Sequence, residues 1–115
     1  MAAADHANRS AGDTIGRHGF SQVGILAGAS SADSLKLLRS TYPQLFMILD
    51  GSDYPNANAR NCSNAFDRFG HGAVACIGSS VTEAWMKQKE GDWLTASRAA
   101  AERMKKNLTR YVTIL

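Results

Sequence analysis

The sequence predicts an α/β fold, a partial (β/α) barrel with about three parallel βα units and a long C-terminal helix. The evidence is a rhythm of short apolar runs, each ending in glycine or a small polar residue and each followed by helical spacing. These runs are Val23–Gly28, Leu45–Gly51 and Ala73–Ser79. Strands that alternate with helices form parallel sheets, which need both faces covered. Because three units do not close a barrel, we expect the chain to function as part of something larger.

Composition indicates one small folded domain. The chain has 115 residues, 44% apolar and 20% charged, enough for a modest core. The net charge of +3 is too weak to indicate a nucleic-acid partner. Basic residues gather near the C-terminus, where a solvated helix face is the favoured interpretation and a docking surface for an acidic partner is the alternative. They are Arg98, Arg103, Lys105, Lys106 and Arg110.

The cysteine count and the hydropathy pattern indicate the cellular compartment of the protein. Cys62 and Cys76 are too few and too far apart for a zinc motif, so we expect two small buried residues in a reducing compartment. Met1–Asn8 has no apolar signal core, and no apolar run approaches the roughly 20 residues of a membrane span. We therefore predict a cytoplasmic protein, or one of an organelle matrix, without membrane partner, metal or cofactor.

The chain divides into residues 1–19 and residues 20–115. The first segment is polar and small, which predicts either a weak helix or a mobile arm. A strand over about Ser21–Ala27 follows, and then a helix capped by Ser30 or Ser31 and ended by Pro43. The buried face of this helix is predicted by apolar spacing at Leu35, Leu38 and Tyr42.

The second unit begins with the strongest strand signal. Leu45–Leu49 is continuously apolar, which is typical of a strand buried on both faces. The next helix is predicted over roughly Ala57–Phe69, with Gly70 after its end. Its inward residues should be Ala65, Phe66 and Phe69.

The third strand is predicted over about Ala73–Ile77. A helix carrying Ala84, Trp85 and Met86 follows from Ser80 or Thr82, and Asp92 caps the last helix. The alanine-rich middle of that last helix allows close packing, and the residues that follow helical spacing along it are Trp93, Ser97, Ala100, Met104, Leu108 and Tyr111.

Candidate site residues lie where the strands end, because ligands of parallel βα folds bind at the carboxyl ends of the strands. Small residues there, before a helix, can offer backbone N–H groups to a phosphate. Asp50 and Asp53 are an acid/base or metal candidate pair, although turn and cap chemistry is the favoured interpretation. No lysine or arginine lies between Arg68 and Lys87, so the third strand-end loop brings no cation of its own.

A family resemblance appears along the first unit. Gly24–Ser30 (GILAGAS), Leu35–Arg39 (LKLLR) and Tyr42-Pro43 resemble the C-terminal half of orotidine 5′-phosphate decarboxylase of the longer bacterial type. The similarity spans roughly Ser21 to Leu108 and is looser after Gly51. Weaker matches are Leu45–Gly51, Gly72–Ser80 and Ala99–Lys105.

The resemblance implies a (β/α)8 barrel, usually a homodimer, that converts orotidine monophosphate to UMP without metal or organic cofactor. Its catalytic Asp/Lys network comes from strands of the N-terminal half, where a lysine stabilises the developing carbanion. Late strand-end loops and an arginine hold the substrate phosphate. The residues that carry over are Gly51, Gly78 and Ser79, as phosphate-binding candidates.

Several departures from the family bear on activity. The segment that supplies the catalytic Asp/Lys network has no counterpart here. Asp50–Asn56 replaces the family's glycine-and-glutamine loop. Where the family has Ser-Arg, this chain has Ser79-Ser80 or Ser80-Val81 and therefore no arginine. We therefore expect a decarboxylase-like polypeptide of UMP biosynthesis that is inactive alone. Its expected partners are itself or a second chain completing the sheet, and a nucleotide monophosphate.

Two alternatives stay open. The first is a non-catalytic binding or assembly subunit on a degenerate half-barrel, since exposed strand edges demand pairing. The second is a phosphosugar enzyme built from dimerising half-barrels, in which Asp50 and Asp53 are the acid and base.

Overall fold

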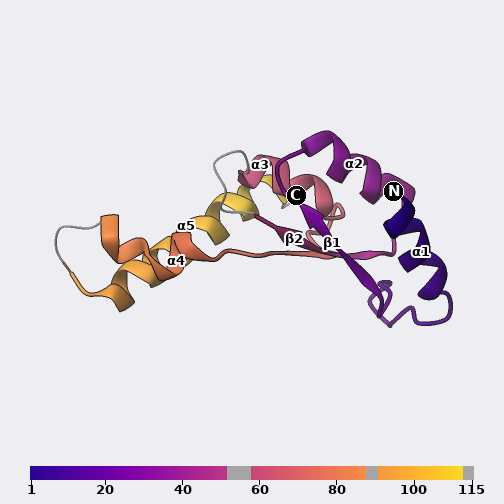
Figure 1. Ribbon diagram of the computed structural model, residues 1–115, viewed down its shortest axis with the longest axis horizontal. Coiled ribbons are helices and arrows are strands. Elements are labelled where there is room, and N and C mark those ends of the chain that lie inside the picture. Colours follow the sequence, from indigo (N-terminus) through magenta and orange to yellow (C-terminus); the bar gives the residue numbers. More distant parts are fainter. Residues whose placement is uncertain (52–57, 88–90, 113–115) are drawn as a thin grey trace.

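The computed structural model has a mixed α/β fold built on a three-stranded parallel sheet in the order β1-β2-β3 (Figure 1). The structure describes residues 1–51, 58–87 and 91–112. The strands are β1 (Gly24–Gly28), β2 (Phe46–Asp50) and β3 (Ala73–Ala75). The helices are α1 (Ala2–Ser10), α2 (Ala32–Thr41), α3 (Ala59–Cys62), α4 (Ser79–Thr82) and α5 (Trp93–Val112), with 3-10 turns η1 (Ser63–Ala65) and η2 (Ala84–Lys87). The α/β class, the parallel strands and the long last helix are as predicted.

One face of the sheet carries the main core. Met47 and Leu49 of β2 are fully buried there, beside Ala27 of β1 and Ala73 of β3. Helices α2, α3 and α5 pack on this same face through Leu35, Cys62, Met104 and Leu108. Each crossover between neighbouring parallel strands turns in the same hand, so sequential strand order places successive helices on one side.

The opposite face of the sheet is bare over the described residues. Leu26 pairs with Ile48, and Ile48 pairs with Val74, so the three side chains form one row across the strands. They are 66%, 40% and 46% exposed, respectively. The prediction that β2 is buried on both faces is therefore wrong, because no helix covers this side. We call the row Leu26, Ile48 and Val74 the open face.

Helix α1 covers the amino-terminal end of the sheet. Its Ala4 and Ala7 pack with Tyr42 and Leu45, next to the main core. Alanines allow the close approach that this contact requires, and Asp5 and Arg9 form an ion pair on the outer surface at 3.0 Å. Residues 2–10 are therefore a packed helix rather than a free arm.

Helix α2 follows the sequence prediction closely. The Ser31 side chain accepts a hydrogen bond from the Ser34 backbone N–H, which caps the helix as expected. Leu35 and Tyr42 are buried and Leu38 is partly buried against the core. The predicted inward face is confirmed.

Arg39, near the end of α2, ties that helix to the starts of the neighbouring strands. Its guanidinium donates to five backbone carbonyls, among them Ala65 at 2.6 Å, Gly72 at 2.8 Å and Leu45 at 2.9 Å. The other two acceptors are the carbonyls of Pro43 and Tyr42. Burial lowers the pKa of Arg39, and the charge of Asp67 opposes that effect. The side chain thus acts as a cationic clamp on backbone groups.

The segment between β2 and β3 is less helical than predicted. The Asn58 side chain accepts from the Asn61 N–H at 2.8 Å and starts α3, but the chain leaves helical geometry at Phe66. There the Asp67 carboxylate accepts from the N–H groups of Phe69 and His71 and forms a turn. Ala65 is buried and Phe66 packs on the core as predicted, whereas Phe69 is exposed because it lies in this turn.

A helical projection extends from the sheet, formed by α4, η2 and the first two turns of α5 (Figure 1). Ala84, Ala96 and Ala100 form its small core, with Val81 packed against them. The molecule measures 51 × 31 × 24 Å with a radius of gyration of 15.5 Å. A compact domain of this length has a radius of about 13 Å. The fold is therefore elongated, because the projection has a small core of its own that shares no residue with the main core.

Large apolar side chains of the projection are exposed. Trp85, Met86 and Trp93 lie in solvent, because only small alanines fit between η2 and α5. Tyr111 is also exposed. Cys62 is buried as predicted, but the prediction that Cys76 is buried is wrong, since Cys76 follows β3 on the segment that leaves the sheet and is exposed.

No helix among the described residues is both long enough and apolar enough to cross a membrane. The same residues contain no group of three or more histidine, cysteine, aspartate or glutamate side chains able to hold a metal ion.

The Arg39 clamp predicts a large effect on stability. Arg39→Met should lower the free energy of unfolding by about 3 kcal/mol, because several carbonyls lose a charged donor. Urea denaturation followed by circular dichroism measures the change. Lys36→Met, on the exposed side of the same helix, should shift it by less than about 0.5 kcal/mol. Equal stability of the two variants would contradict the clamp.

Asp92 predicts a pH dependence for α5. Hydrogen bonds from the Thr95 side chain and backbone N–H hold the pKa of Asp92 below its usual value of 3.8. The ionised cap therefore stabilises the fold above about pH 4, and this contribution is lost as the pH falls through the lowered pKa. Asp92→Asn keeps a capping oxygen but does not titrate. The melting temperature of this variant should change less on acidification than that of the wild type. Equal changes in the two proteins would contradict the role of the Asp92 cap.

Candidate functional site

The carboxyl edge of the sheet holds part of the predicted site. Asp50 ends β2 opposite Gly28 of β1, and its carbonyl accepts from the Ala29 N–H at 3.0 Å. The Asp50 residue is exposed, while Gly51 is buried and has a φ of 72°. That positive φ favours glycine at the end of the strand. Asp53 lies outside the described residues.

The other two phosphate-binding candidates belong to the projection. Gly78 precedes α4, and its carbonyl accepts from the N–H groups of Val81 and Thr82. Ser79 lines a pocket with Glu83 and Lys87, and every lining residue comes from α4, η2 or Glu83 between them. The structure thus places Gly51 beside the sheet and Ser79 on the projection, and it does not bring them into one pocket.

A polar groove lies instead between α3 and the end of α5. It has a volume of about 370 Å³. Its polar side chains come from two elements, and we call it the basic groove. The lining residues are Asn58, Ala59, Arg60, Asn107, Arg110 and Tyr111.

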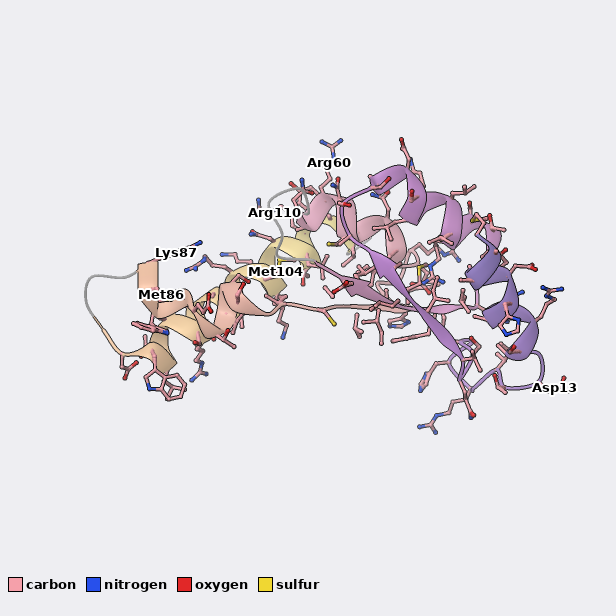
Figure 2. All side chains as sticks on the ribbon, in the orientation of Figure 1. Asp13, Arg60, Met86, Lys87, Met104 and Arg110 are labelled. Atoms are coloured by element: carbon pink, nitrogen blue, oxygen red, sulfur yellow. The ribbon has the colours of Figure 1, made fainter. Side chains whose placement is uncertain are left out.

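Local structure explains how the groove forms. The Asn58 cap fixes the start of α3, and buried Cys62 holds this short helix on the core. Met104 and Leu108 hold the second half of α5 on the same core. Asn107 and Arg110 are three residues apart, so they share one helix face. This face meets α3, which brings Arg60 and Arg110 to one groove (Figure 2).

The charges of the groove are uncompensated among the described residues. The ion pairs among the described residues join Arg9 to Asp5 and Arg98 to Glu102, and neither pair involves Arg60 or Arg110. Guanidinium groups bind phosphate and carboxylate through paired N–H donors. Two of them, with the amides of Asn58 and Asn107, therefore suit an anionic ligand.

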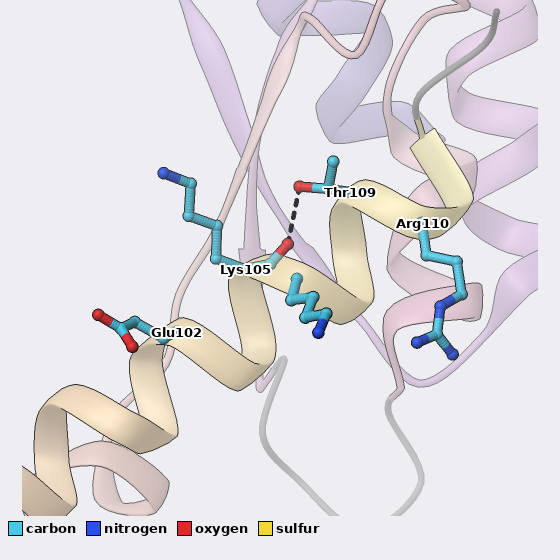
Figure 3. Close-up of a pocket in the computed structure, with 5 residues that line it drawn as sticks. Glu102, Lys105, Thr109 and Arg110 are labelled. Carbon is cyan, nitrogen blue, oxygen red and sulfur yellow. Dashed lines mark hydrogen bonds between the residues drawn. The ribbon is translucent and has the colours of Figure 1, made fainter.

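A second, flatter basic surface adjoins the groove along α5 (Figure 3). Thr109 Oγ1 donates back to the Lys105 carbonyl at 2.8 Å, which turns its hydroxyl away from any ligand. All lining residues come from one helix and include Arg110, which also lines the basic groove. The lining residues are Glu102, Lys105, Lys106, Thr109 and Arg110. This surface agrees with the solvated face expected from the sequence, and it adds positive potential beside the groove.

Sequence reasoning missed Arg60 as a site residue, and it named Arg110 only among the basic residues of the C-terminal helix, with a docking surface for an acidic partner as the alternative interpretation. It looked for cations inside the strand-end loops, whereas these two lie far apart in the chain and meet only when α3 packs on α5. The one local signal was the spacing of Asn107 and Arg110 on a helix that also carries core residues at Met104 and Leu108.

Comparisons with known proteins do not assign a family. No model of a known protein family matches the chain, and no curated protein is significantly similar to it.

The geometry predicts weak anion binding in the groove. Inorganic phosphate should shift the side-chain NMR signals of Arg60 and Arg110 with a dissociation constant on the order of 1 mM. Arg110→Gln should weaken this binding several-fold. Arg98→Gln, on the same helix but ion-paired with Glu102, is the matched control and should leave it unchanged. Equal losses in both variants would mean that phosphate senses only the net charge.

Proposed function

We propose that this chain is an orotidine 5′-phosphate decarboxylase-like polypeptide of UMP biosynthesis. In this proposal it binds the phosphate of a nucleotide monophosphate and does not decarboxylate on its own. The proposal is supported by the resemblance over Ser21–Leu108 together with the way the sheet is wound.

The winding of the sheet carries the proposal. Strands in sequential order with α2, α3 and α5 on one face match a segment of a (β/α) barrel, in which the other face is the interior. A doubly wound sheet would carry helices on both faces. The uncovered, apolar open face therefore supports a partial barrel.

The basic groove supplies what the strand-end loops lack. The family's phosphate-binding arginine has no counterpart after Gly78, but Arg60 and Arg110 offer two guanidinium groups. Asn58 and Arg60 begin the helix that follows β2, which places them on the carboxyl side of the sheet. Ligands of parallel βα folds bind on this side.

The chemistry of decarboxylation is absent from the described strand ends. Residues 28–31, 50–51 and 76–80 include Asp50 but no lysine or arginine. Without a lysine beside a carboxylate, developing carbanion charge has no preorganised cation. Activity would then need another chain to supply the Asp/Lys network.

A second function, a non-catalytic assembly subunit, is favoured by the open face. Leu26, Ile48 and Val74 present a continuous apolar row that a monomer leaves in water. Phosphate binding and assembly are compatible, because the basic groove lies on the helix-covered side.

Calorimetric titration of the chain with UMP and with uridine tests the proposal. UMP should bind with a dissociation constant on the order of 1 mM or tighter, and uridine should bind at least tenfold more weakly. Arg60→Gln with Arg110→Gln should abolish the difference, whereas Arg98→Gln should preserve it. Equal affinity for UMP and uridine would contradict a phosphate site. Turnover of orotidine monophosphate by the purified chain would contradict its inactivity alone.

A further inference from the structure

Two large apolar surfaces remain without a partner in the described part of the chain. One is the open face of the sheet. The other, which we call the projection tip, consists of Trp85, Met86, Trp93 and Leu94. The two tryptophans are 50% and 65% exposed, so this is more apolar surface than scattered single residues give.

The two surfaces are far apart within one chain. The core of the projection is made of Val81, Ala84, Ala96 and Ala100, with no residue from the sheet. Met86 and Lys87 lie near the free end of the projection, at the opposite end of the molecule from Asp13 (Figure 2). Helix α5 is continuous from the projection to the main core, which keeps the tip away from its own sheet.

We propose that the projection tip of one chain packs on the open face of a second copy, and that the second copy returns the same contact. This inference names the partner in the assembly role proposed above. A two-fold axis across the long molecule makes both contacts equivalent and closes the assembly as a dimer.

The exposed area is sufficient for such a dimer. The seven side chains of the tip and the open face expose on the order of 700 Å² per chain, given the 150–250 Å² that a large aromatic side chain can bury. Specific, stable interfaces bury about 600–1,000 Å² from each partner, so this area lies within that range. Tryptophan and methionine are also the residues enriched in the cores of protein interfaces.

Charge is complementary at the margins. The paired strand residues carry one charged side chain, Asp50, which lies two residues after Ile48 and on the same side of β2. Lys87 follows Met86 at the projection tip. In the exchanged dimer Lys87 and Asp50 supply one pair of opposite charges at the margin of each contact.

The chain carries its own probe of this contact. Its two tryptophans are both at the projection tip. Diluting the wild-type protein should therefore shift the tryptophan emission to longer wavelength as the dimer separates. Sedimentation equilibrium on the same samples should give a dimer at high micromolar concentration and a monomer on dilution.

Complementation between two variants decides the mode of pairing. Leu26→Lys disables the open face, and Trp85→Ser with Trp93→Ser disables the tip. Each variant alone should be monomeric, whereas their mixture should form a heterodimer with one intact contact. Val74→Lys is the second open-face variant if Leu26→Lys fails to fold by circular dichroism. Leu37→Ser, which removes an exposed leucine from α2, should dimerise like the wild type.

Each other outcome overturns the inference. A wild-type chain that stays monomeric excludes the dimer. The titration of the same chain with UMP tests the proposed function independently of this result. Dimerisation of the Leu26→Lys variant alone would indicate tip-to-tip contact, and that of the tryptophan variant alone would indicate face-to-face contact. Binding of the wild-type monomer to anionic lipid vesicles would assign the tip to a membrane surface instead.

Discussion

The fold depends on the clamp that Arg39 makes with five backbone carbonyls. These carbonyls belong to the turn after α2, the start of β2, the end of η1 and the residue before β3. The Gly72 carbonyl also accepts from the Met47 N–H, and a Cβ at Gly72 would lie 2.5 Å from the Phe20 ring and 3.0 Å from Arg39 Nη2. One partly buried cation thus fixes the relative positions of two strands and two helices. A carbonyl left without its donor in this partly buried place costs more than the bond itself contributes.

From this anchored end the strands run in sequence, and the rest of the architecture follows. Sequential order places α2, α3 and α5 on one side, where Met47 and Leu49 form the core. The other side keeps an apolar row that no described helix covers. Because α5 is long, its first half leaves the sheet and exposes Trp93, while Trp85 is exposed on η2, which packs beside it. Its second half meets α3 and forms the basic groove. The open face, the projection and the groove therefore all follow from the sequential order of the strands and the length of α5.

The sequence predicted what local chemistry decides. The Ser31 and Asp92 caps, the buried face of α2 and the three parallel strands all follow from spacing and capping. It did not predict what depends on distant packing. The run Leu45–Leu49 is apolar on both faces, but an apolar run cannot tell whether a helix covers the second face. The helix predicted over Ala57–Phe69 ends early because the Asp67 carboxylate forms a competing turn. Arg60 and Arg110 meet only through tertiary contact, so the spacing of Asn107 and Arg110 on one helix could not by itself predict the groove.

Among the described residues of one chain, helices cover one face of the sheet and none covers the other. Paramagnetic relaxation of methyl NMR signals by a soluble, uncharged probe tests it most directly. At a concentration low enough for the chain to be monomeric, the methyl signals of Leu26, Ile48 and Val74 should relax strongly. Those of Leu35, Leu45 and Leu49, which are fully buried, should be unaffected. If Ile48 is as protected as Leu49 in the dilute monomer, a part of the same chain covers the open face and the account is wrong.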